Sequence, residues 1–387
     1  MFRIIGLVLV AMVEPSAASA QWTAEQRLLS MFEWIPEDLD SLDPEDISLY
    51  QRPIQGFGFV GREDIAESML ENAPSLTSTE ACPERGTVAD FLEQLEAEAA
   101  DTRIVMLNES HFEPRHRLLV VQIAERLVEQ GYEFFAAETF NIWVAEGRAP
   151  GSVPYNIGAY SYEPVYARML RRIDELYLTT LAYEQTPEQV PENPETWEER
   201  INARETAQAA NMMDALFDHD QDAKVIIFVG GGHLFEQPVN NEGREEVRWF
   251  GNRLAEATGV NHVTIYQTKC SSEGTTVWAD GSETNISHQV DHFIAHPPVE
   301  FERNRPTWRR EIGDIDTDIP AELLSESERV IVEAHPAGGS TEEVAIDRLM
   351  LFPGEDIPLL LPPGRYDVRS WTADGLLGGP VEISVGD

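Results

Sequence analysis

Residues 104–117, IVMLNESHFEPRHR, contain the transition that decides the predicted fold class. The apolar run from Arg103 to Leu107 suits a buried strand, whereas Pro114 to Gln130 repeats apolar residues at helical spacing and is followed by a glycine. The sequence therefore predicts a strand followed by a helix, and the short segment between them carries Glu109 and His111.

This strand and helix unit recurs along the chain. Further strands are predicted at residues 132–137, 177–183, 224–229 and 263–267, and further helices at 163–175, 196–217 and 245–257. Thr196 and Glu199 form a capping-box signature at the start of one of these helices. Alternation of this kind predicts an α/β fold with a mostly parallel sheet flanked by helices. The long connection at 141–162 is typical of a functional lid.

The chain divides into four predicted segments. Residues 1–20 form a signal peptide, 21–95 a lead-in of helices and loops, 96–294 the α/β core, and 295–387 a small all-β domain like a β-sandwich. The last segment is predicted from strand patterns at 330–333, 365–370 and 381–385, which clusters of Pro, Gly and Asp separate.

The N-terminus predicts export to the periplasm or the medium. Arg3 precedes an apolar run from Ile4 to Val13, and Ala18-Ser19-Ala20 suits cleavage after Ala20. A membrane-spanning helix needs about 20 apolar residues, so the run is too short for an uncleaved anchor, and no later segment suits a membrane span.

An oxidising compartment permits a disulfide between Cys82 and Cys270, the only two cysteines. Two free thiols are the alternative. Their wide separation in sequence does not match the close spacing of zinc sites.

The chain has 69 acidic and 28 basic residues and a formal net charge of −41. This excess excludes nonspecific binding to nucleic acid or anionic lipid. We therefore expect a small-molecule or peptide partner, while the oligomeric state stays undetermined.

Proton carriers or potential ligands follow four of the predicted strands. They are Glu109 and His111, Glu138, Glu184, and His233. Because the carboxyl ends of parallel strands meet at one edge of a sheet, these side chains are predicted to share one site.

Each strand end suggests its own chemistry. Glu109 and His111 are two positions apart, so an extended backbone directs both to one side. The carboxylate can orient the imidazole as a general base for water, both can bind one metal ion, or the acid can simply satisfy the histidine. Glu138 ends the apolar FFAA run and must be paired or face a cavity, because an unpaired buried charge is costly. The glycines before His233 allow a tight turn.

Cationic side chains lie close to these strand ends in sequence. Arg115 and His116 begin the helix after Glu109 and could stabilise an oxyanion or bind a substrate anion, or could simply be solvated. Arg204 lies on a polar helical stripe with Gln208 and Asn211, and it could pair with a strand-end glutamate. We expect Glu109, His111, Arg115, Glu138 and His233 to be catalytic, and His116, Glu184 and Arg204 to bind substrate.

Several catalytic classes lack their motifs. The sequence contains no GxSxG elbow, no HExxH motif and no plausible cysteine nucleophile. Hydrolysis by an activated water, with or without a metal, is the reaction type that these absences leave open.

Six segments carry a resemblance to a known superfamily. They are IVMLNESHFEPRHR (104–117), FFAAETF (134–140), EPVYARML (163–170), LAYE (181–184), RETAQAAN (204–211) and VIIFVGGGH (225–233). In order and spacing they resemble the erythromycin esterase, ChaN-like and Tiki/TraB superfamily, over roughly residues 100 to 270, and an uncharacterised exported branch of it in particular.

The resemblance implies a pocket lined by Glu109, His111, Glu138 and His233, with three possible activities. Erythromycin esterase-like proteins use a histidine to activate water on an ester. Tiki-like proteins are metal-dependent proteases, which implies Mn or Zn on those four residues. ChaN-like proteins bind haem without catalysis, in which case the tyrosines of the 141–162 connection, Tyr155, Tyr160 and Tyr162, are candidate ligands.

Overall fold

The structure is a computed structural model that describes residues 23–36, 47–73, 79–138, 140–141, 145, 148–240 and 245–386. The predicted signal peptide, residues 1–20, lies outside the described residues. Within the described part of the chain, no helix has the length and apolar character needed to cross a membrane.

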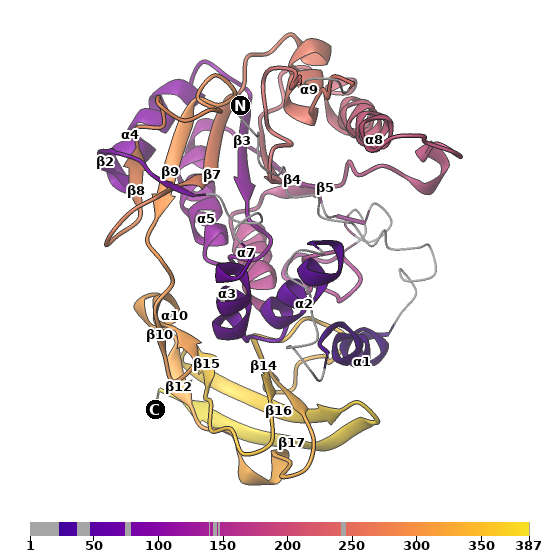
Figure 1. Cartoon of the computed structure of the whole chain (residues 1–387), viewed down its shortest axis with the longest axis vertical. Helices are drawn as coiled ribbons and strands as arrows, with labels where there is room; N and C mark the ends of the chain where they lie inside the picture. Colours follow the sequence, from indigo (N-terminus) through magenta and orange to yellow (C-terminus); the bar gives the residue numbers. More distant parts are fainter. Residues whose placement is uncertain are drawn as a thin grey trace.

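A nine-stranded sheet forms the centre of the α/β region, in the order β2-β8-β9-β7-β3-β6-β4-β5 with β1 beside the end of β7 (Figure 1). The strands are β1 (Glu80–Ala81), β2 (Glu84–Thr87), β3 (Ile104–Glu109), β4 (Phe134–Ala137), β5 (Thr179–Leu181), β6 (Val225–Gly230), β7 (Val263–Ser271), β8 (Val277–Ala279) and β9 (His292–His296). All neighbouring strands are parallel except β8, which runs antiparallel to β2 and β9. The predicted mostly parallel sheet is confirmed.

Helices cover both faces of this sheet. Successive side chains of a strand point to opposite faces, and in β3 the side chains on both faces are apolar and need to be buried. On β3, Val105 and Leu107 join a core cluster with α4 (Val88–Ala99), α5 (His116–Leu127) and α7 (Pro164–Glu175). Ile104 and Met106 join the cluster on the other face, to which α8 (Trp197–Met212) and α9 (Phe250–Thr258) contribute.

Two of the predicted helix starts differ in detail from the structure. The Thr196 hydroxyl accepts the Glu199 N–H as expected, but the Glu199 carboxylate accepts the N–H of Glu195, one residue outside the capping box. The helix predicted at 245–257 begins only at Phe250, because Val247 pairs with Val239 in a β-bridge.

The sequence did not reveal β2, β8 and β9. The first two have only four and three residues, and the HFIAH run of β9 offers three apolar residues between histidines. Strand β9 extends to His296 and belongs to the main sheet, so the core continues past residue 294.

The C-terminal region contains additional antiparallel sheets. β14 (Asp347–Leu351), β13 (Val330–Pro336), β16 (Gly364–Thr372) and β17 (Gly375–Val385) form a four-stranded sheet in that order. Two smaller pairs are β12 (Ile315–Thr317) with β15 (Leu359–Leu361), and β10 (Phe301–Glu302) with β11 (Arg305–Pro306), which precedes α10 (Thr307–Glu311).

The lead-in helices lie between the main sheet and the C-terminal strands in Figure 1. They are α1 (Ala24–Trp34), α2 (Ile47–Phe59) and α3 (Glu63–Glu71). Phe57 and Phe59 of α2 share one apolar cluster with Leu107 of the central strand and Met350 of β14. The C-terminal strands are thus continuous with the core of the α/β region.

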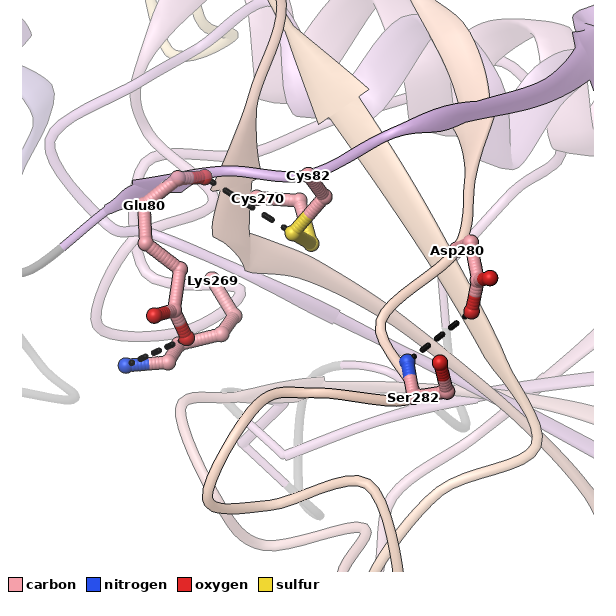
Figure 2. Close-up of a disulfide and its surroundings, with 6 residues drawn as sticks. All are labelled: Glu80, Cys82, Lys269, Cys270, Asp280 and Ser282. Carbon is pink, nitrogen blue, oxygen red and sulfur yellow. Dashed lines mark hydrogen bonds and ion pairs between the residues drawn. A yellow bond between two sulfur atoms is a disulfide. The ribbon is translucent and has the colours of Figure 1, made fainter.

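The cysteines form a disulfide between Cys82 and Cys270, with their Cα atoms 5.3 Å apart (Figure 2). The bond joins the segment after β1 to the end of β7, where β1 pairs in parallel with Cys270 and Ser271. Beside it, Lys269 Nζ lies 3.4 Å from Glu80 Oε1. The disulfide therefore fixes the chain entering the sheet at the strand ends.

Candidate active site

Glu109 and His111 form a buried pair at the end of β3. Glu109 Oε1 lies 2.9 Å from His111 Nδ1, and the two side chains are only 3% and 7% exposed. Because a carboxylate can only accept, Nδ1 carries the proton and the lone pair of a neutral imidazole lies on Nε2. No described residue forms a hydrogen bond with Nε2, so this atom is available to a water or a substrate.

Arg117 of α5 fixes the Glu109 carboxylate. Its Nε donates to Oε2 at 2.7 Å, and its Nη2 donates to Oε1 at 3.3 Å. Burial raises the pKa of Glu109, but attraction to Arg117 and His111 outweighs it and holds the pKa below its usual range. Glu109 is therefore an ionised carboxylate facing the imidazole.

Glu163 holds the other side of Arg117. It accepts a short hydrogen bond from Arg117 Nη1, and it caps α7 by accepting the N–H groups of Val165 and Tyr166 at 2.8 and 2.7 Å. The start of α7 thus determines where Arg117 lies, and through it where Glu109 lies.

The imidazole of His111 lies between an aromatic ring and a glycine. The Tyr160 ring stacks on it with centroids 3.8 Å apart and planes inclined by 16°. On Gly230, the last residue of β6, an added Cβ would lie 2.5 Å from His111 Nε2. Only glycine leaves room for the ring at that position.

Glu138 follows β4 and lies beside this pair. Its Oε2 accepts the Gly230 N–H at 2.6 Å, and its Oε1 accepts Arg204 Nη2 at 2.8 Å. Burial raises the pKa of Glu138, but His233, Arg204 and His111 together lower it to about 2. The buried charge expected at the end of the FFAA run is therefore present and paired.

Arg204 brings Glu138 and Glu184 together from α8. Its Nε and Nη2 lie 3.0 and 2.5 Å from the two oxygens of Glu184. Gln208, one turn further along the helix, donates to Glu184 Oε2 at 3.0 Å. The polar stripe seen in the sequence thus faces the ends of β4 and β5.

His233 belongs to a second carboxylate–imidazole pair, with Glu205 of α8. Its Nδ1 lies 2.8 Å from Glu205 Oε1, and Glu205 Oε2 also accepts the Phe250 N–H at 2.7 Å. His233 Nε2 lies 3.5 Å from Glu138 Oε1 and 3.3 Å from Arg204 Nη1. Burial lowers the pKa of His233, but Glu138 and Glu205 raise it above the usual value. This histidine is suited to carry a proton.

Arg115 and His116 do not join the cluster. Arg115 Nη2 donates to Glu113 at 3.0 Å, and His116 Nδ1 accepts the Ser110 N–H at 3.0 Å. The His116 ring packs against His296 of β9, on the side of the sheet order away from β6. Burial and the charge of Arg115 lower the pKa of His116 to about 3, so its imidazole is neutral at neutral pH.

Four residues of the site did not stand out in the sequence. Arg117 lies two positions after Arg115 in the same PRHR run, and Glu163 is the first residue of the helix predicted at 163–175. Tyr160 was expected only as a haem ligand. Glu205 follows Arg204 within the helix predicted at 196–217, and no neighbouring residue indicates that it belongs to the site.

The donor groups do not fit a divalent metal or haem. The described residues contain no group of three or more His, Cys, Asp or Glu side chains that could hold a metal ion. Glu109 and Glu138 are instead neutralised by Arg117 and Arg204, which a metal would have to displace.

The candidate haem ligands also make contacts within the protein. The Tyr155 hydroxyl bonds Glu333 and Arg348, the Tyr160 ring covers His111, and the Tyr162 ring packs on Phe59.

No family model matches the sequence, and no curated protein matches it. Solved structures match at low similarity. The type III effector HopBA1 is 15% identical with a TM-score of 0.36, and the match covers 57% of this chain and 97% of that one. A mutant of erythromycin esterase EreC in its open conformation is 11% identical with a TM-score of 0.35, covering 71% and 94%. ChaN of Campylobacter jejuni, described with cofacial haem binding, is 12% identical with a TM-score of 0.32, covering 53% and 91%. Similarities of this size do not show an activity.

Proposed function

We propose that this protein is a hydrolase that cleaves an ester, lactone or peptide bond with a water activated by His111. The observation that carries the proposal is the presence of two carboxylate–imidazole pairs, Glu109–His111 and Glu205–His233, on either side of Glu138. One histidine with a free Nε2 and a second with a raised pKa are the parts that general base and general acid catalysis need.

The first step uses the pair at the end of β3. His111 Nε2 takes a proton from water, and the resulting hydroxide adds to the substrate carbonyl carbon. Glu109, held by Arg117, accepts the Nδ1–H and stabilises the imidazolium that forms. Tyr160 and Gly230 fix the plane of the ring so that Nε2 keeps one direction.

The second step uses the pair at the end of β6. His233 protonated on Nε2 no longer accepts from Arg204 Nη1, 3.3 Å away, and the two cations place positive charge beside the oxygen that becomes negative in the tetrahedral intermediate. The bond to the leaving group then breaks, and His233 donates its Nε2 proton to the leaving atom. A water then relays the Nε2 proton of the His111 imidazolium to Nε2 of His233, which returns His111 to its neutral form and His233 to its protonated form.

The proposal is tested by measuring turnover of a panel of esters, lactones and peptides by the wild type and by His111→Gln. General base catalysis contributes about 10²- to 10⁴-fold, so turnover of any active substrate should fall at least 100-fold. His219→Gln, at an exposed position, is the matched control and should keep full turnover. A His111→Gln protein that folds and turns over like the wild type would refute the mechanism. Because arginines pair with the carboxylates, turnover should also survive treatment with a chelator.

Export remains part of the proposal. The N-terminal segment ending at Ala20 and the Cys82–Cys270 disulfide both support an oxidising compartment. N-terminal sequencing of the protein from the periplasm or medium should begin at Gln21, and any other first residue would contradict the cleavage site.

A further inference from the structure

We propose that Arg348 of the C-terminal sheet is a positioning residue for His111, acting through the segment 155–162. The inference rests on the proposed function for the role of His111, but its geometry stands independently. It gives the C-terminal strands a part in the site although they contribute no residue to it.

Arg348 lies on β14 and is completely buried. Its Nη1 donates to the carbonyl oxygens of Phe59 and Tyr162, both at 3.0 Å, and its Nη2 donates to the Tyr155 hydroxyl at 2.7 Å. One guanidinium therefore binds the segment at both of its ends, and joins it to the end of α2.

Glu333 of β13 fixes the guanidinium in turn. Its Oε1 accepts Arg348 Nε at 2.7 Å and also accepts a short hydrogen bond from the Tyr155 hydroxyl. Burial raises the pKa of Glu333, but Arg348 and His335 lower it to about 2, so the carboxylate is charged and Arg348 stays paired. A buried ion pair that several further hydrogen bonds support holds its geometry tightly.

Tyr160 lies between the two anchored residues, Tyr155 and Tyr162, and it stacks on the His111 ring. Moving either anchor changes where the Tyr160 ring lies, because only a few residues separate them. The backbone of Gly61 confirms how closely the C-terminal strand approaches: a Cβ there would lie 2.2 Å from the Arg348 carbonyl oxygen. The contacts thus form a continuous path from β13 and β14 to the catalytic imidazole.

The experiment follows the His111 ring directly by NMR. A stacked aromatic ring shields the imidazole protons, so Tyr160→Leu should move the His111 signals downfield and defines the unstacked position. Arg348→Lys, which keeps the charge but loses the fork of donors, should move these signals toward that position. Tyr155→Phe, which removes only the hydroxyl, should also move the His111 signals toward the unstacked position. It tests the inference if Arg348→Lys fails to fold.

Arg309→Lys is the control, because Arg309 is equally buried among acids but bonds Asp314, Asp347 and the Leu360 carbonyl and not the segment. It should leave the His111 signals unchanged even if the protein is less stable. On an active substrate, Arg348→Lys should lower kcat with little change in KM.

Unchanged His111 signals in folded Arg348→Lys and Tyr155→Phe would overturn the inference, as would an equal shift in Arg309→Lys. A wild type that shows the shielded signals but hydrolyses nothing would refute the proposed function and leave the positioning role intact.

Discussion

Gly230 lies against the imidazole of His111 so closely that an added Cβ would come within 2.5 Å of Nε2 and 2.6 Å of Cε1. Gly230 is the last residue of β6, and His111 lies two residues beyond the end of the neighbouring parallel strand β3, so their contact fixes how far the ring can enter the site. A change of one methyl group at this position should therefore affect the site more than the fold.

Gly230→Ala should displace the His111 ring and reduce turnover about 100-fold, because an error of about 1 Å in a catalytic group has that effect. Overpacking should cost about 1 to 3 kcal/mol in the free energy of unfolding, measured in urea. Gly274→Ala, where no atom lies within 4 Å of the added Cβ, should change neither quantity. Normal turnover in Gly230→Ala would show that catalysis does not depend on the present position of the His111 ring.

The stability of the protein should fall steeply in acid because of Glu138. Its folded pKa is about 2 against an ordinary 4.5, so its contribution is present above pH 4.5 and is lost as the pH falls toward 2. A difference of this size corresponds to about 3 kcal/mol. Urea unfolding between pH 6 and 3 should show a smaller loss in Glu138→Gln than in the wild type, and parallel curves would contradict this role.

Glu205→Gln should lower the pKa of His233, because Glu205 is one of the two carboxylates that raise it. The interaction stabilises the wild type below the unfolded histidine pKa of about 6.5 and is lost as the pH rises through the folded value. NMR titration of the histidine signals, assigned with a His233→Gln variant, measures the shift directly. An unchanged His233 pKa in Glu205→Gln would show that Glu205 does not raise the pKa of this histidine.

Replacing both cysteines, Cys82→Ser with Cys270→Ser, should lower the free energy of unfolding by about 2 to 5 kcal/mol, since the bond closes a long loop with a sequence separation of 188. Turnover at a temperature where the variant is folded should be unchanged, because the hydrogen bonds given above for Glu109, His111 and Glu138 involve neither cysteine. A variant as stable as the wild type would show that the β1 pairing alone holds this segment.

The sequence was sufficient to predict the helices and strands that have strong local patterns. The apolar runs of β3, β4 and β6 and the periodic helices between them gave the mostly parallel sheet, since burial on both faces leaves a continuous apolar run. The short strands β2 and β8 were missed because their pairing depends on neighbours distant in sequence rather than on their own few residues.

By itself, the sequence determined that Glu109, His111, Glu138, Glu184 and His233 follow strands of one parallel sheet and so lie along one edge. Only the tertiary structure decided which side chains each of them contacts. Arg117 rather than Arg115 holds Glu109, and Glu205 rather than any strand-end acid holds Nδ1 of His233. The reason is physical: strand direction fixes which end of a strand a residue occupies, whereas the partner of a buried charge depends on how α5, α7 and α8 pack against that edge.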